Sequence, residues 1–213
     1  MPDVIETTEP VTEPPTVSGA EALKWEFLNI VFLSVAIGDA LKHNKTYAST
    51  ATDEDRKALR RELSSAMVEF AEKYKMPVEP ADHRKNLTAL EEQVSKKCGS
   101  FLVGGDRRQE GHLRRGTAQK AFNLYLKFLW CAGRIPTPPH CTIDRTVIEK
   151  LPKELRSVKW TQIDSEDEYD KIIEAAQKVA SDEPLAEWEL REWNQANNPT
   201  VGLADLLNCD DET

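Results

Sequence analysis

Residues 113–148 constrain the fold of this chain more than any other stretch of its sequence. From position 118 to 130 almost every side chain is apolar, and a run of about three turns like this predicts a helix that is buried on most of its circumference. Polar residues interrupt the run at four places: Gln119, Lys120, Asn123 and Lys127. Positions 120, 123 and 127 are spaced by three and four, so they share one helix face. A polar stripe on a buried helix must reach water, a partner group or a functional site.

The rest of the sequence predicts an all-α protein, because helical periodicity and helix caps recur and no alternating strand pattern or internal repeat appears. Further helices are expected over 20–42, 53–74, 88–98, 144–151, 165–176 and from 182 onward. We expect an irregular helical bundle, with residues 20–198 as one helical domain and 150–198 as a candidate second lobe. Three prolines, Pro136, Pro138 and Pro139, predict an extended linker after the central helix.

Two of these helices rest on specific signals. The helix over 20–42 has apolar residues on more than one face, among them Leu23, Phe27 and Phe32, and is expected to be a core element. Thr88 followed by Glu91 matches a capping box, which places the start of the third helix near Thr88.

The formal net charge of −9 is unevenly distributed along the chain. Residues 1–19 contain four acidic and no basic residues, and residues 199–213 likewise contain four acidic residues and no basic one. Both are expected to be disordered acidic tails that can bind a protein partner. Residues 107–134, in contrast, hold seven Lys or Arg residues and one Glu, which predicts a local basic face suited to nucleic acid.

Several classes of protein are disfavoured by the sequence. The longest apolar window, 27–37, is interrupted by polar residues and is too short for a membrane span. Four scattered cysteines fit a reduced, cytoplasmic setting better than a disulfide framework. His140 and Cys141 lack the paired-cysteine spacing of a zinc site, so no metal is expected. No nucleotide-binding glycine motif is present, and no cofactor is expected.

The strongest chemical signal combines a glycine, a lysine and an aspartate. Gly116 opens the central helix, where free backbone N–H groups can bind a phosphate. Lys120 follows inside the helix, where apolar neighbours and nearby arginines would lower the pKa of its amine and make it a nucleophile. Asp144 begins the next helix beyond the proline linker, where helix amides stabilise a carboxylate.

These residues resemble the helix-hairpin-helix DNA glycosylase superfamily. In its bifunctional members a glycine-containing hairpin leads to a lysine at the start of a helix, and an aspartate follows near the start of the next helix. The resemblance implies that Gly116 and Ala118 lie in a phosphate-binding hairpin, that Lys120 forms a Schiff base with the sugar of an extruded nucleotide, and that Asp144 stabilises the positive charge that develops.

The functional hypothesis is therefore a DNA-binding base-excision enzyme of the glycosylase/lyase type. The catalytic candidates are Lys120 and Asp144. The nucleic-acid-binding candidates are Arg107, Arg108, Arg114, Arg115, Gly116, Thr117, Ala118 and Lys127. The supporting candidates are Gln119, Asn123, His140 and Arg145. The alternative hypothesis is a non-catalytic helical module that binds protein or nucleic acid, in which the lysines extend from a core helix to solvent and Asp144 is only a helix cap.

Overall fold

A computed structural model describes residues 18–42, 44–104 and 111–197 of the chain. Within these ranges the fold is all-α, as predicted, and extended pairing is limited to two isolated bridges. The α-helices are α1 (Gly19–Lys42), α2 (Asp53–Ala71), α3 (Pro80–Cys98), α4 (Arg115–Cys131), α5 (Arg145–Lys150), α6 (Glu166–Ala180) and α7 (Leu185–Asn197). Short 3₁₀ turns follow α2, α3 and α5: η1 (Glu72–Lys75), η2 (Gly99–Phe101), η3 (Lys153–Leu155) and η4 (Trp160–Gln162).

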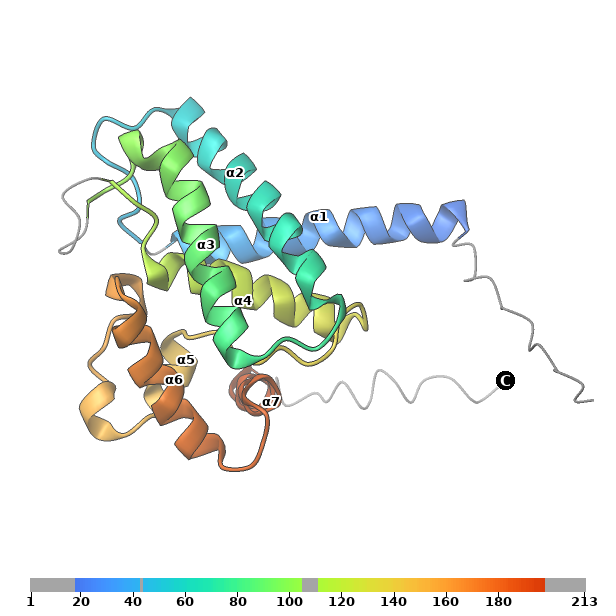
Figure 1. The fold of residues 1–213 in the computed structure, drawn as a ribbon, viewed down its shortest axis with the longest axis vertical. Coiled ribbons are helices and arrows are strands. Elements are labelled where there is room, and N and C mark those ends of the chain that lie inside the picture. Colours follow the sequence, from blue (N-terminus) through green and yellow to red (C-terminus); the bar gives the residue numbers. More distant parts are fainter. Residues whose placement is uncertain (1–17, 43, 105–110, 198–213) are drawn as a thin grey trace, which may run out of the picture.

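Helix α4 lies at the centre of the molecule, as its sequence predicts. It contacts α1, α2 and α3 on one side and α6 and η4 on the other, so the N-terminal and C-terminal parts of the fold both pack against this central helix (Figure 1). Fourteen of its 17 residues are buried. The candidate second lobe, residues 150–198, contributes α6, which packs on α4 and α5, and α7, which packs on α5 and α6.

The observed helix ends follow from local chemistry. Thr52 caps α2 through a complete capping box with Asp55. The Ser165 hydroxyl accepts a hydrogen bond from the Glu168 backbone N–H at the start of α6, 3.1 Å away. Asp144 caps α5 by accepting a hydrogen bond from the Val147 N–H.

The predicted start of the third helix near Thr88 is wrong. Helix α3 begins two turns earlier, at Pro80, because proline lacks an N–H and has a fixed φ that suits the first position of a helix. Thr88 lies inside α3, where its hydroxyl donates to the carbonyl of Arg84. The pair at 88 and 91 therefore occurs within a helix and does not mark its start.

The expectation that the first helix is entirely a core element is also wrong. Only the C-terminal part of α1 is buried, at Ala36, Ile37, Ala40 and Leu41. Its N-terminal half extends beyond the other helices (Figure 1). Leu23 and Phe27 remain 68% and 66% exposed there.

Candidate functional site

The polar stripe of α4 faces the segment that connects α4 to α5. The Gln119 amide forms two hydrogen bonds with Ile143, donating to its carbonyl at 2.7 Å and accepting from its N–H at 3.0 Å. One turn further, the Asn123 amide donates to the Cys141 carbonyl at 2.8 Å. The stripe therefore satisfies the backbone of a buried loop. These contacts also hold Asp144, the next residue after Ile143, against α4.

Lys120 lies between two carboxylates. Its ammonium nitrogen is 2.9 Å from Asp144 Oδ2 and 2.9 Å from Asp39 Oδ2, which extends from α1. The other oxygen of Asp144 accepts the capping hydrogen bond from Val147, so one carboxylate both starts α5 and binds the lysine. The sequence-predicted pair, Lys120 and Asp144, thus comes together in space.

The charge state of Lys120 follows from two opposing effects. Burial of its side chain alone would lower the pKa of the ammonium, but Asp144 and Asp39 together outweigh burial and hold that pKa above its ordinary value. The resting site is therefore a lysine cation with two carboxylate partners, and the expected lowering of the lysine pKa is absent in the free chain. A lysine that acts as a nucleophile here must first give up a proton.

A pocket of about 440 Å³ opens beside this ion triad. Asp39, Lys120 and Asp144 line it together with Lys127. Its apolar wall comes from α1, α4 and α7 and consists of Val35, Leu124, Phe128, Cys131, Leu190 and Trp193. Small-molecule pockets range from roughly 300 to 1,000 Å³ and combine an apolar lining with a few polar groups, which is the character of this one.

Lys127, predicted to contact nucleic acid, forms a buried ion pair at the same pocket. Its ammonium lies 2.9 and 3.1 Å from the two carboxylate oxygens of Glu189 on α7. Burial raises the pKa of Glu189 above its ordinary value even with Lys127 beside it. Because both ends of this pair are largely removed from water, Lys127 is held in place by Glu189 in the free chain.

The start of α4 is covered by protein. The Gly116 N–H donates to the Ile163 carbonyl at 2.8 Å, and a methyl group at Gly116 would come within 1.9 Å of the Trp160 carbonyl oxygen. Gly116, Thr117 and Ala118 are all buried. The helix-start position predicted to bind phosphate therefore packs against η4 in this structure. The glycine is required for close approach of that turn.

The predicted basic face is only partly displayed at the surface. Arg115 is buried and pairs with Glu91, 2.9 Å from its Nε. Arg114 is half-buried and donates to the Gly104 carbonyl. Thr117 contacts Asn44 through its hydroxyl. Arg107 and Arg108 lie outside the described residues.

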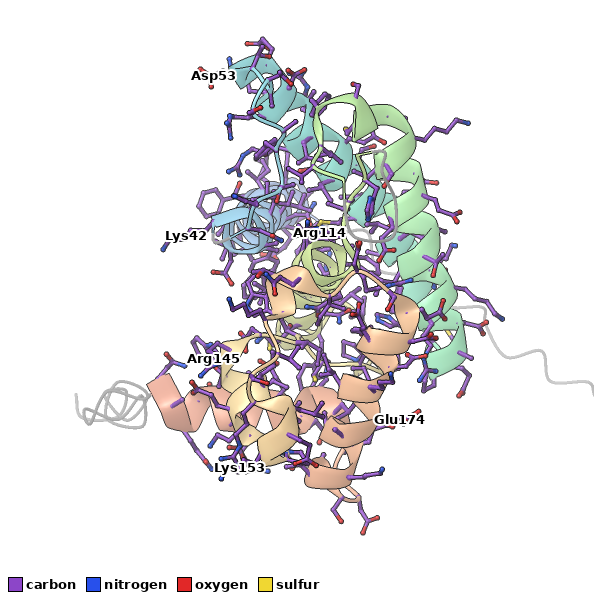
Figure 2. The ribbon with its side chains drawn as sticks, turned by 90° about the vertical axis from the view of Figure 1, so that its left-hand side faces the viewer. Lys42, Asp53, Arg114, Arg145, Lys153 and Glu174 are labelled. Carbon is purple, nitrogen blue, oxygen red and sulfur yellow. The ribbon has the colours of Figure 1, made fainter. Side chains whose placement is uncertain are left out.

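Exposed cations occur instead along the side of the molecule that carries Lys120 and Asp144. Lys42 ends α1 one turn beyond Asp39, and Arg145 directly follows Asp144. Figure 2 shows Lys42 and Arg145 on the same side of the molecule. Lys159 is likewise exposed, and its neighbour Trp160 places its ring centre 6.0 Å from the Lys120 ammonium.

His140, a supporting candidate, belongs to a buried cluster behind the site. Its Nδ1 is 2.9 Å from the Tyr169 hydroxyl, which also accepts from Asn123. The His83 ring lies 4.6 Å from the His140 ring, centre to centre. Burial lowers the pKa of His83 to about 3, and that of His140 well below its ordinary value. These neutral rings are part of the core and do not line the pocket.

Two site residues, Asp39 and Glu189, were missed in the sequence because no spacing links them to α4. Asp39 lies three residues before the end of α1 and is the one charged residue at positions 27–41 of that helix, which was the available signal. Glu189 is one of several acidic residues on α7.

Comparison of the chain with models of protein families, with curated proteins and with solved structures finds no match in any of the three. None of the helices in the described ranges combines the length and the apolar content that crossing a bilayer requires.

Proposed function

We propose that this chain is a base-excision enzyme of the glycosylase/lyase type, with Lys120 as nucleophile and Asp144 as its partner carboxylate. The observation that supports it is the 2.9 Å contact between these two side chains at the wall of a pocket. They come from different helices, and Gln119 and the α5 cap hold the second helix in place. An amine and a carboxylate held together beside a pocket are what covalent catalysis at a sugar carbon needs.

The reaction begins with removal of one proton from the Lys120 ammonium. Asp39, whose side chain is 45% exposed, accepts it and releases it to water. The amine then forms a bond to the sugar carbon C1′ while the bond from C1′ to the base breaks, and the departing base takes the proton that the newly bonded nitrogen gives up. The bond from C1′ to the ring oxygen then breaks, the ring oxygen takes a proton from water, and the nitrogen lone pair forms the C=N bond of a protonated imine on Lys120. The Asp144 carboxylate stabilises the positive charge of that imine.

The pocket supports this substrate class by its size and lining. An enzyme that acts on a nucleotide in a duplex must extrude it into a pocket, where apolar and aromatic side chains pack on the base. Phe128 and Trp193 are the aromatic residues in the wall. Lys42, Arg145 and Lys159 supply positive charge for the flanking phosphates.

The decisive experiment is borohydride trapping with DNA that contains an abasic site. We expect wild-type protein to form a covalent adduct and Lys120→Arg to form none, because a guanidinium does not form the imine. The substitution preserves the positive charge between Asp39 and Asp144, so the fold is maintained and can be verified by circular dichroism.

Lys127→Arg is the matched control, since it changes a second buried, ion-paired lysine of the same pocket. It should retain the adduct. Absence of an adduct with wild-type protein, or equal loss in both variants, would refute the assignment of Lys120.

The alternative function, a non-catalytic helical binding module, is favoured by a different observation. Both carboxylate contacts of Lys120 also fit a purely structural ion cluster, and α1 exposes an apolar face. This function predicts no adduct, and a module whose partner is a protein also predicts no binding of abasic DNA at low salt.

A further inference from the structure

The N-terminal half of α1 is a helix with two apolar faces, of which only one has a partner. Phe32 packs on Phe128 of α4, with ring centres 5.2 Å apart. Asn29 accepts a hydrogen bond from the Tyr125 hydroxyl at 2.6 Å. The Arg134 guanidinium lies 4.1 Å from the centre of the Trp25 ring. These contacts fix α1 to α4 along one side.

The opposite side of α1 is apolar and exposed. Its large side chains are Leu23 at 68%, Phe27 at 66%, Leu28 at 41%, Ile30 at 56%, Val31 at 36% and Val35 at 48% exposure. A helix that is apolar all round is normally buried all round. Elsewhere in the described ranges, exposed large apolar residues occur singly on other helices and turns, so this concentration on one helix is distinctive.

We propose that this face of α1 is a self-association surface, on which α1 of a second copy of the chain packs in antiparallel orientation. Leu23, Phe27, Ile30 and Ser34 follow one another at intervals of four, three and four, which is the seam of a two-helix coiled coil. A two-fold axis midway between Phe27 and Ile30 places Phe27 opposite the partner's Ile30. It also places Leu23 opposite the partner's Ser34, so that a large side chain meets a small one.

The size of the face agrees with this occupant. Six partly exposed apolar side chains present on the order of 500 Å², the upper range for a patch on a monomer. A stable dimer buries about 800 Å² on each partner, with an apolar centre and a polar rim. The apolar face therefore supplies the centre of a dimer interface. Lys24 and Glu26, which flank the seam, supply polar rim groups.

The steric arrangement also allows a second copy to approach. The N-terminal half of α1 extends beyond the other helices, which leaves its exposed side open to a partner helix (Figure 1). Val35 belongs to this face and also lines the pocket. The same two-fold axis brings the N-terminal end of the partner's α1 level with Val35, so the second copy borders one edge of the pocket. The proposal does not depend on the reaction assigned to Lys120.

Sedimentation velocity of the full chain over a range of concentrations tests the proposal. We expect a dimer, and Phe27→Asp should convert it to a monomer with an unchanged circular dichroism spectrum, since Phe27 is mostly in water in the single chain. Met76→Asp is the matched control, because Met76 is 72% exposed and caps the end of η1 rather than belonging to α1. It should leave the dimer intact.

Disulfide formation tests the orientation. With Cys131 and Cys209 replaced by serine, Leu23→Cys combined with Ser34→Cys should form an intermolecular disulfide on air oxidation, whereas Ser34→Cys alone should not. A wild-type chain that is monomeric at all concentrations overturns the proposal and assigns the face to residues 198–213 or to another protein. A dimer unaffected by Phe27→Asp, or a crosslink from Ser34→Cys alone, also overturns it.

Discussion

The buried ion pair between Lys127 and Glu189 gives a quantitative test of the pocket wall. Their side chains are 10% and 1% exposed, and the ammonium contacts both carboxylate oxygens. Removing one partner of a buried pair costs about 3–5 kcal/mol, because the remaining charge stays buried without compensation. For Glu189→Gln we expect the lower end, about 3 kcal/mol, since Lys127 borders the pocket and can turn toward water.

Lys127→Met should show a distinct dependence on pH. Burial already raises the pKa of Glu189 with the lysine present, so that pKa rises further without it. A carboxyl group whose folded-state pKa exceeds its unfolded-state value destabilises the fold as pH rises above the unfolded value, here about 4.3. The cost of Lys127→Met should therefore grow between pH 5 and pH 7.5, by up to about 1.4 kcal/mol per pH unit. The cost of Glu189→Gln should not grow in this way.

The double substitution Lys127→Met with Glu189→Leu completes a thermodynamic cycle with wild type, Lys127→Met and Glu189→Leu alone. An apolar pair of similar volume can replace a buried ion pair at little net cost, so the double variant should be more stable than either single one. Urea unfolding at pH 7.5, followed by tryptophan fluorescence, measures all four proteins. Single losses below about 1 kcal/mol that simply add would show a solvated pair, and would refute the buried pocket wall described above.

Three further predictions concern the core and the site. Burial lowers the pKa values of His83 and His140, so both rings are neutral in the folded protein. The free energy of unfolding should therefore fall as pH drops below about 6.5, by up to about 1.4 kcal/mol per pH unit for each histidine. Urea midpoints that stay constant down to pH 4.5 would contradict this prediction. Gly116→Ala should destabilise the chain by about 1–3 kcal/mol because its methyl group meets a backbone carbonyl, whereas an unchanged melting temperature combined with weaker DNA binding would restore the phosphate hypothesis for this glycine. Asp144→Asn should keep the cap but slow adduct formation, whereas Asp144→Ala should also cost about 1 kcal/mol of stability; thermal unfolding and trapping rates, measured together, would contradict the capping argument if the two variants melt alike.

The sequence predicts the helices well where local chemistry decides the outcome. The near-continuous apolar run marks α4 as the central helix, and the caps at Asp144 and Ser165 mark α5 and α6 because a side-chain oxygen must satisfy the free amides there. The predicted start of α3 is wrong because the capping-box pattern at Thr88 and Glu91 also occurs inside a helix, whereas the true start is at Pro80, a residue type suited to the first helical position.

The sequence is a poorer guide to which helices lie next to one another. Its periodicity shows that α1 has apolar faces, but not how many turns of α1 the other helices cover. Phe27 was therefore assigned to the core, although it is exposed. The proximity of Lys120 and Asp144 was anticipated from the resemblance. The second carboxylate, Asp39, was not, because it comes from a helix far away in sequence. The reaction itself stays a prediction.

The cover that η4 places over the start of α4 has a consequence for biosynthesis. The amide of Gly116 finds its acceptor at Ile163, and α6 packs on the same central helix. During translation the central helix therefore emerges well before its last cover does. A product that stops after α5 would leave the buried central helix open to water at one end. Such truncated chains should aggregate or be degraded, so only chains that include the C-terminal helices should accumulate as folded protein.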